Sequence, residues 1–273
     1  MDLDETLAKL AKAPTAAVDL AEVALHIAVD EYSQLDIAGY LGELDAMAGD
    51  ARRFLGRGLE NQVAGLCRYL FHEAGFHGNQ HHYYDPRNSY LNEVLDRQTG
   101  IPITLSVVAI AVGRRAGITV EGVALPGHFI AMVHSNGERI LFDPYHGGKL
   151  LQPDDCFEIA HRAAGAEVEI SPEMMEPAAP GTIVTRMLSN LKGCYLRKGD
   201  FRRAARTIQR IIQISPGDLS HHRDLGVCCV QAGQPGRAID HLTKYLNGDP
   251  DAGDMEAVEK LLQQARAEVA KWN

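Results

Sequence analysis

The sequence predicts an α+β domain followed by an all-α region, and three observations support this prediction. A nearly apolar stretch, residues 101–113, suits a buried helix and is too short to span a bilayer. Further on, two strand-like runs are joined by Asn136-Gly137, and Asn-Gly between such runs is a strong hairpin signal. From residue 182 onward the pattern is helical throughout and repeats itself.

Helices are predicted for the N-terminal part of the chain, residues 1–75. One helical face is formed by apolar residues at spacings of i, i+3, i+4 and i+7, namely Val63, Leu66, Cys67 and Leu70. Further along, Ser89 is predicted to cap a short helix. Pro102 suits the first position of the next helix, which is expected to run to Arg115.

A polar and aromatic segment, residues 76–88, interrupts these helices. Loops of this length between packed elements are usually functional or disordered. Strands are then predicted over 119–125, 128–134 and 139–145, and a helix is predicted near 153–164. The second and third strands form the predicted hairpin.

A linker is predicted over residues 171–182, because three prolines and a glycine lie close together there. It separates a first domain, residues 1–170, from a helical region, residues 183–273. The chain is therefore expected to contain one domain of ordinary size and a smaller second one.

The helical region contains an internal repeat with an offset of 34 residues. Four residue pairs recur at this offset: Leu191 and Leu225, Gly199 and Gly233, Ala204 and Ala238, and Pro216 and Pro250. This offset is the period of the tetratricopeptide repeat. Two repeats are predicted over about 185–218 and 219–252, and residues 256–271 are predicted to form a capping helix.

Composition limits the class of function. The 273-residue chain has a net charge of −9, which argues against nucleic-acid binding, since that needs a basic surface. The N-terminus is acidic and unlike a signal peptide, and no stretch is long enough to predict membrane insertion. The five cysteines are an odd number without metal-ligand spacing, so a reducing, cytoplasmic setting with no cofactor is expected.

Charge is spread unevenly along the chain. Residues 1–50 hold eleven Asp or Glu and two Lys, whereas residues 183–216 hold eight Lys or Arg and one Asp. Charge runs are usually solvated helix faces. The alternative is that the basic first repeat docks on the acidic N-terminal helices or on an acidic partner, with apolar burial holding the contact. The linker would then wrap the surface rather than act as a hinge.

The hairpin register brings a histidine and a carboxylate together. If Asn136 and Gly137 form the loop, paired residue numbers sum to 273, and His128 and Asp143 are diagonal neighbours on one face. An imidazole beside a carboxylate is the base and orienting group of a nucleophilic triad. The same pair is also a common structural contact at a sheet edge.

Four ordered motifs carry a family resemblance. They are Tyr84-Asp85-Pro86-Arg87-Asn88-Ser89-Tyr90-Leu91-Asn92, Gly100-Ile101-Pro102-Ile103-Thr104-Leu105, Pro126-Gly127-His128-Phe129 and Asp143-Pro144. With the repeats, they resemble the bacterial SirB-type family, which looks like a transglutaminase-like core followed by tetratricopeptide repeats. The resemblance implies an α+β, papain-like fold with a helix packed on an antiparallel sheet. It also matches His128 and Asp143 to the catalytic His and Asp of the wider superfamily.

The resemblance does not extend to the catalytic cysteine. That residue should lie at the start of the helix beginning at Pro102, yet no cysteine occurs between Cys67 and Cys156. The nearest hydroxyls belong to Thr104 and Ser106, and an alcohol is a much weaker nucleophile than a thiolate. The chain is therefore expected to lack thiol-dependent activity.

Three functions follow as hypotheses. The first is a non-catalytic scaffold that binds a protein or peptide partner through the former substrate groove and the repeats. The second is a papain-like hydrolase or acyltransferase that uses Thr104 or Ser106 with His128 and Asp143. The third is a structural His–Asp site, with all function in the repeats. A hydroxyl within ~3 Å of the His128 ring would favour the second.

Candidate binding residues come from the first motif: Tyr84, Asp85, Asn88 and Asn92. Helix capping explains Asn88 or Ser89 equally well. The nearby His77, His81 and His82 raise the question of zinc. They lack a helical His pair or a Cys pair, so the sequence predicts no metal site.

Overall fold

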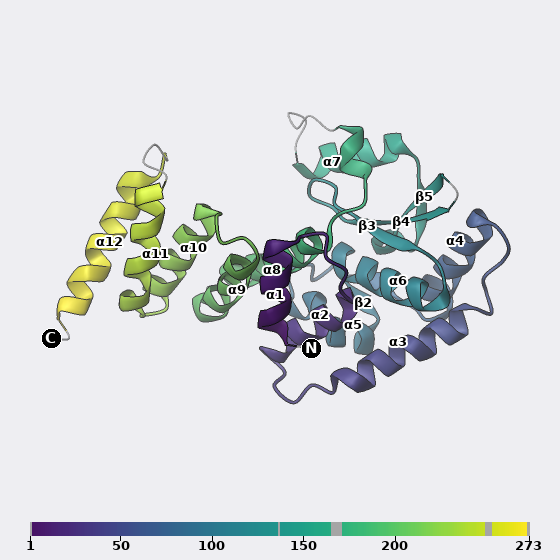
Figure 1. Ribbon diagram of the computed structural model, residues 1–273, viewed down its shortest axis with the longest axis horizontal. Coiled ribbons are helices and arrows are strands. Elements are labelled where there is room, and N and C mark those ends of the chain that lie inside the picture. The colour runs from purple at the N-terminus through teal and green to yellow at the C-terminus, as the bar shows by residue number, and fades with distance from the viewer. Residues whose placement is uncertain (1, 136, 165–170, 249–252, 272–273) are drawn as a thin grey trace. The chain divides into compact units, whose positions relative to one another are not determined.

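The computed structural model describes residues 2–135, 137–164, 171–248 and 253–271 (Figure 1). The chain divides into two compact units. We call Thr15–Met187 the sheet unit, and Met1–Pro14 together with Leu188–Asn273 the repeat unit. The predicted domain limits place the N-terminal residues with the first domain, whereas compactness groups them with the repeats.

A four-stranded antiparallel sheet is the centre of the sheet unit. In order across the sheet, its strands are β3 (Val120–Val123), β4 (Ile130–Ser135), β5 (Glu138–Asp143) and β6 (Lys149–Leu151). Ser135 pairs with Glu138 and Ala131 with Phe142, which confirms the predicted hairpin register. The sequence does not predict the short edge strand β6, because it is preceded by the turn formers Gly147-Gly148.

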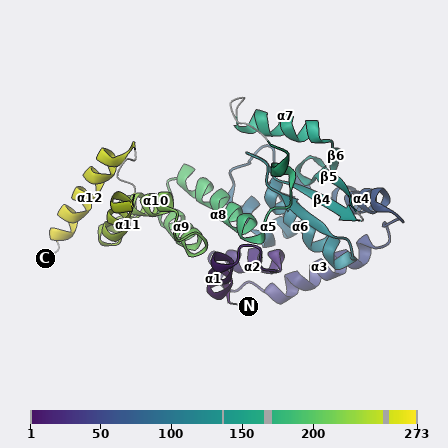
Figure 2. The same ribbon diagram turned by 45° about the horizontal axis from the view of Figure 1, so that its top comes forward.

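Helices cover both faces of this sheet (Figures 1 and 2). On one face, α6 (Pro102–Ala116) packs against β3 and β4. Gly113 of α6 lies so close to Val120 that an added Cβ would stand 2.3 Å from the valine side chain, so this contact requires glycine. On the other face, α7 (Pro153–Ala164) contributes to a buried cluster that includes Ile130, Met132, Leu141 and Cys156.

The remaining helices of the sheet unit come from its N-terminal part. α2 (Leu20–Val29), α3 (Ile37–Ala51) and α5 (Leu91–Arg97) pack against α6, and α4 (Leu59–Cys67) packs against β4 and β5. α4 continues into the π-helix η1 (Arg68–Glu73). The predicted helical face therefore spans α4 and η1.

The polar segment 76–88 contains short elements of secondary structure and is not an irregular loop throughout. β1 (His77–Gly78) pairs in parallel with β2 (Thr99–Gly100), and η2 (Pro86–Ser89) is a 3-10 turn. Ser89 belongs to this turn, so the predicted cap at Ser89 is wrong. Tyr90 is the N-cap of α5 and makes no side-chain cap bond.

The proline-rich linker packs on the sheet unit. It includes the 3-10 turn η4 (Pro172–Met175), and Met175 is buried in the cluster beneath α7. Pro177 forms a β-bridge with Val123 before α8 (Pro180–Arg197) begins. These contacts hold the start of the linker on the sheet unit.

The repeat unit contains two helical hairpins and a final helix. They are formed by α8 and α9 (Phe201–Ile214), by α10 (Leu219–Gln231) and α11 (Pro235–Gly248), and by α12 (Met255–Ala270). Equivalent positions behave alike: Gly199 and Gly233 have φ angles of 68° and 71°, where glycine is favoured. Ala204 and Ala238 are both fully buried. Pro250, the last residue of the predicted pattern, lies outside the described residues.

Helices close the repeats at both ends of the unit. α1 (Leu3–Lys12) packs against α9, with Leu7 and Leu10 fully buried. Its Asp4 pairs with Arg210 and with Gln213. The basic first repeat therefore meets an acidic residue of α1, although α1 itself carries two acidic and two basic residues. At the other end, α12 acts as the predicted capping helix and buries Val258, Leu262 and Ala265.

Within the described residues, no helix combines the length and low polarity that a membrane span requires. The apolar character of α6 is explained by burial, since its residues from Pro102 to Gly113 are all buried in the sheet unit.

Candidate functional site

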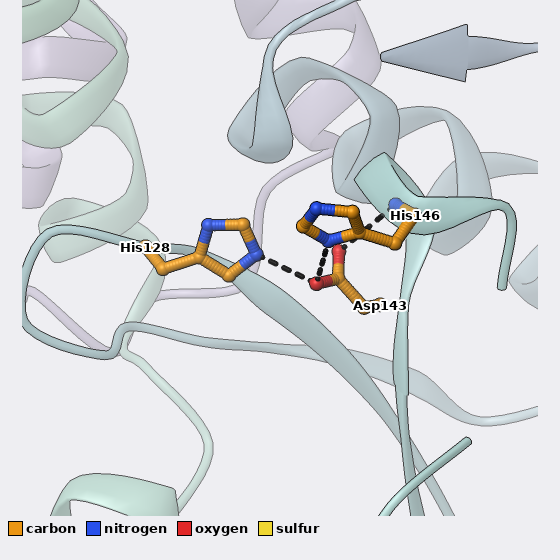
Figure 3. Close-up of side chains that lie close together, drawn as sticks. All are labelled: His128, Asp143 and His146. Atoms are coloured by element: carbon orange, nitrogen blue, oxygen red, sulfur yellow. Dashed lines mark hydrogen bonds and ion pairs between the residues drawn. The ribbon is translucent and has the colours of Figure 1, made fainter. Parts of the chain in front are cut away.

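His128 and Asp143 are hydrogen-bonded to each other in the sheet unit (Figure 3). Nε2 of His128 lies 2.8 Å from Oδ2 of Asp143. His128 stands just before β4 and Asp143 ends β5, so antiparallel pairing of these strands brings the two side chains together. The predicted proximity is confirmed. The side chains are 11 % and 1 % exposed, respectively.

A second histidine, His146, shares the same carboxylate oxygen. Its Nδ1 lies 2.7 Å from Oδ2 of Asp143, and it ends the 3-10 turn η3 (Pro144–His146). The other oxygen, Oδ1, accepts the backbone N–H groups of Tyr145 and His146. Sequence reasoning missed His146. The available signal was an Asp-Pro turn start with a histidine three residues after the Asp.

The two histidines keep Asp143 ionised. Burial acts to raise the pKa of Asp143, but hydrogen bonds and charge interactions with His128 and His146 outweigh burial and lower it. Burial and the Asp143 charge raise the pKa of the neighbouring Tyr145. The site therefore holds one fixed negative charge between two imidazole rings.

A guanidinium anchors the loop that carries His128. Nη2 of Arg186 donates to the backbone carbonyl of His128 at 2.6 Å. The same group stacks over the ring of Phe129, 5.6 Å from its centroid. Burial lowers the pKa of Arg186. Together these contacts tie the loop to the first part of α8, which belongs to the sheet unit.

A chain of aromatic rings leads from the surface to the pair. Tyr84 is 50 % exposed, and its ring centroid lies 5.2 Å from that of Tyr83. Tyr83 and Tyr145 are 6.1 Å apart, and Tyr145 and His128 are 6.2 Å apart, again between centroids. A cavity of about 610 Å³, lined in part by Tyr145, His146 and β1, lies beside this chain.

The two hydroxyls that the sequence suggests as nucleophiles, those of Thr104 and Ser106, are both buried. Thr104 is fully buried, and its Oγ1 donates to the Asn88 carbonyl at 2.8 Å and accepts the Ile101 N–H at 3.1 Å. Ser106 is fully buried too, and its Oγ has no hydrogen-bond partner among the described residues. Over the same residues, the structure records no hydrogen bond from either hydroxyl to His128. Thr104 thus caps the N-terminus of α6.

Two of the predicted binding residues organise the polar segment. The fully buried Asn88 donates to the His82 carbonyl at 2.7 Å and accepts from Asn79 at 3.1 Å. Asp85 pairs with Arg87 at 2.6 Å and caps η2. These contacts hold the segment in shape.

The other two predicted binding residues differ in exposure. Asn92 is buried, and no partner is recorded for its Oδ1 within the described residues. Tyr84 is half exposed, and its ring packs against that of Tyr83. In the part of the chain that the structure describes, one group of metal-ligating side chains converges, and it comprises His128, Asp143 and His146.

All five cysteines are free and buried. Burial raises the pKa of Cys67 to about 12 and those of Cys156 and Cys228 to about 11. Reactive cysteines have lowered pKa values and partial exposure, and these three thiols have neither.

Comparison with known proteins agrees with this fold. The Transglutaminase-like superfamily matches residues 38–189, and the Tetratricopeptide repeat matches residues 191–263. The two matches therefore define a transglutaminase-like domain followed by tetratricopeptide repeats. This chain belongs to the UPF0162 family, the SirB-type family that its motifs resemble.

The relatives cover most of the chain. It is 35 % identical to a UPF0162 protein of Xylella fastidiosa, over 91 % of this chain and 90 % of that protein. Identity to a UPF0162 protein of Pseudomonas aeruginosa is 32 %, over 78 % and 77 %. A shorter match, 31 % over 118 residues, relates 40 % of this chain to 19 % of the F-box only protein 21 of Homo sapiens.

Proposed function

We propose that this chain acts in protein–protein interaction, with a transglutaminase-like domain that binds a partner and does not catalyse acyl transfer. One observation carries the proposal. At the start of α6, the Thr104 hydroxyl is buried and held by Asn88 and Ile101, and within the described residues neither Thr104 nor Ser106 is hydrogen-bonded to His128. The His–Asp pair is kept without the group that it would activate.

The cysteines support the same proposal. Nucleophilic catalysis by cysteine needs a thiolate, and burial of Cys67, Cys156 and Cys228 strongly disfavours that form. Five free thiols also fit the reducing, cytoplasmic setting that the sequence predicts.

The partner is proposed to be a protein or peptide. Tyr84, Tyr83 and Tyr145 form an aromatic path beside the cavity, and exposed aromatic side chains are common anchors at interfaces. The tetratricopeptide repeats supply a second surface, since such repeats generally mediate protein interaction.

The absence of catalysis is tested by covalent labelling of the full chain. Intact mass would be measured after treatment with a thiol-directed haloacetamide and, separately, with a hydroxyl-directed fluorophosphonate. We expect no adduct that depends on His128, so the wild type and His128→Ala should behave alike. His134→Ala is the matched control, since His134 is an exposed histidine of the same sheet. An adduct lost only in His128→Ala would favour a hydrolase instead.

The proposed binding surface is tested by replacing each of two exposed apolar residues of the sheet unit. Tyr84 is 50 % exposed beside the site, whereas Leu150 is 53 % exposed and lines another cavity. Partners would be crosslinked to the full chain in cells and quantified by mass spectrometry. Tyr84→Ala should lose a defined partner that Leu150→Ala keeps. Retention of every partner by Tyr84→Ala would restrict the interaction function to the repeats.

A further inference from the structure

We propose that His128, Asp143 and His146 bind one divalent transition-metal ion of the zinc class, such as Zn²⁺ or Co²⁺. The inference goes beyond the proposed interaction function, which requires no metal. The inference concerns His128 and Asp143 again, but metal binding is measured in a separate experiment from covalent labelling and partner crosslinking.

Three donor atoms converge on one point (Figure 3). Nε2 of His128 and Nδ1 of His146 lie 2.8 and 2.7 Å from Oδ2 of Asp143, and all three atoms lie within 4.8 Å of one another. Zinc bonds of about 2.0–2.2 Å at tetrahedral angles separate donor atoms by ~3.4 Å. Both imidazole nitrogens must therefore move away from Oδ2 by ~0.6–0.7 Å to admit the ion.

The donor set selects the class of ion. Two imidazole nitrogens and one carboxylate oxygen suit Zn²⁺, Co²⁺ or Fe²⁺, whereas Mg²⁺ and Ca²⁺ prefer oxygen ligands alone. Because Asp143 is ionised, the site also brings a negative charge to the cation.

Metal binding at this site requires that the two ring nitrogens facing Asp143 carry no proton. In the hydrogen-bonded cluster, the ring protons lie on the nitrogens that face Asp143. Among the described residues, no hydrogen bond is recorded at Nδ1 of His128 or at Nε2 of His146. Each proton can move to that other nitrogen, which frees a lone pair for the cation.

Surrounding contacts hold the ligands in place. Oδ1 of Asp143 is fixed by the N–H groups of Tyr145 and His146, which leaves Oδ2 directed at the two rings. Arg186 holds the backbone of His128. Such outer contacts are what orient the ligands of metal sites in proteins.

The site is open on one side. The His146 side chain is 52 % exposed and also lines the cavity of about 610 Å³. Three protein ligands leave at least one coordination position free for water or for a group of a bound partner. That is the arrangement of reactive rather than purely structural zinc sites.

The test is metal titration of the full-length protein after treatment with a chelator. Zn²⁺ binding would be measured by calorimetry, and Co²⁺ binding by its visible absorption bands, with Mg²⁺ as the control ion. We expect one Zn²⁺ or Co²⁺ per chain and no Mg²⁺ binding at the same concentrations.

Matched variants locate the ion. His146→Gln should weaken Zn²⁺ binding by about tenfold or more, since even outer-shell partners contribute roughly that much to metal affinity. His134→Gln should leave it unchanged, because His134 pairs with Glu121 elsewhere on the sheet. Thermal unfolding of His146→Gln in the absence of metal checks that the variant is folded. His128→Gln is the second variant, and it should weaken binding as well.

Two results would overturn the proposal. One is a wild-type protein that binds neither Zn²⁺ nor Co²⁺ at ~100 µM, a concentration far above the Kd of typical zinc sites. The other is equal binding by the wild type, His146→Gln and His128→Gln, which would place the ion elsewhere. Neither result changes the labelling expected for the interaction proposal.

Discussion

Each of the two units contains a pair of neighbouring histidines, and the two pairs lie beside opposite charges. In the sheet unit, His128 and His146 both bond to the carboxylate of Asp143. In the repeat unit, His222 and His241 are stacked with Nδ1 atoms 2.9 Å apart. The ammonium group of Lys244 lies 3.0 Å from Nε2 of His222.

The neighbouring charge decides what each pair can bind. Lys244 donates to Nε2 of His222, so the ring proton of His222 lies on Nδ1 and is donated to His241. Burial, followed by the charges of Lys244 and His241, lowers the pKa of His222. This pair rejects a further proton or cation and serves packing. The pair on Asp143 has the charge that attracts a cation.

Replacing the central carboxylate is expected to have the largest effect on stability. Asp143→Ala removes the acceptor of two imidazoles and of the Tyr145 and His146 N–H groups in a buried position. Loss of a cap and of buried hydrogen bonds should destabilise the sheet unit by roughly 2–4 kcal/mol. Urea unfolding, monitored by hydrogen exchange, would measure the loss of unfolding free energy in each unit separately.

The control for this variant is Asp154→Ala, which changes an exposed carboxylate at the start of α7. Its effect should stay below about 1 kcal/mol, the usual range for a charge near a helix N-terminus. Equal losses for the two variants would mean that Asp143 is not the centre of the site.

Acidification is expected to have an intermediate effect, and to act first on the repeat unit. Burial is the main cause of the lowered pKa of His222 and of His241, so the unfolded chain takes up protons more readily than the folded unit. The stability of the repeat unit should fall as the pH drops below ~6.5, the ordinary value for histidine. For Asp143 the lowered pKa has a different consequence: its stabilisation is present above ~3.9 and is lost only in stronger acid.

Hydrogen exchange at pH 7.5 and pH 5.5 separates these two responses. The amides of α10 and α11 should lose protection at the lower pH more than the amides of β4 and β5. In His222→Gln this difference should shrink, although His241 and His221 also have pKa values lowered by burial. Loss of protection first in the sheet would contradict the comparison.

Local patterns made much of the fold predictable. The 34-residue offset places Gly199 and Gly233 at equivalent turns and Ala204 and Ala238 in equivalent contacts. The Asn-Gly pair in the sequence predicts the register of β4 and β5, and that register is enough to place His128 beside Asp143. In each case the information lies in residues that are close together in the chain or linked by one turn.

Some parts that the sequence does not reveal depend on contacts between distant segments, and others depend on short 3-10 turns. The hydroxyl of Thr104 donates a hydrogen bond to the carbonyl of Asn88, which lies sixteen residues earlier in the chain. The position of Thr104 near the start of α6 therefore did not reveal that this hydroxyl is already bonded. His146 joins the site through a 3-10 turn that Pro144 starts. Ser89 resembles a helix cap in sequence, yet it is enclosed in the turn that Asp85 caps.

The smallest effect is expected for an exposed ion pair in the repeat unit. Asp4 of α1 pairs with Arg210 of α9 but is 61 % exposed, so Asp4→Asn should cost no more than about 1 kcal/mol. Leu7 lies on the same helix and is fully buried, and Leu7→Ala should cost about 2–5 kcal/mol. Urea unfolding of both variants at low and high salt would compare them. A cost for Asp4→Asn that equals the cost for Leu7→Ala and vanishes in salt would mean that charge holds α1 in place.

The expected result is a smaller cost for Asp4→Asn than for Leu7→Ala. It would mean that apolar burial holds this helix and that charge only orients it. In the sheet unit, by contrast, one buried carboxylate both stabilises and orients its histidines.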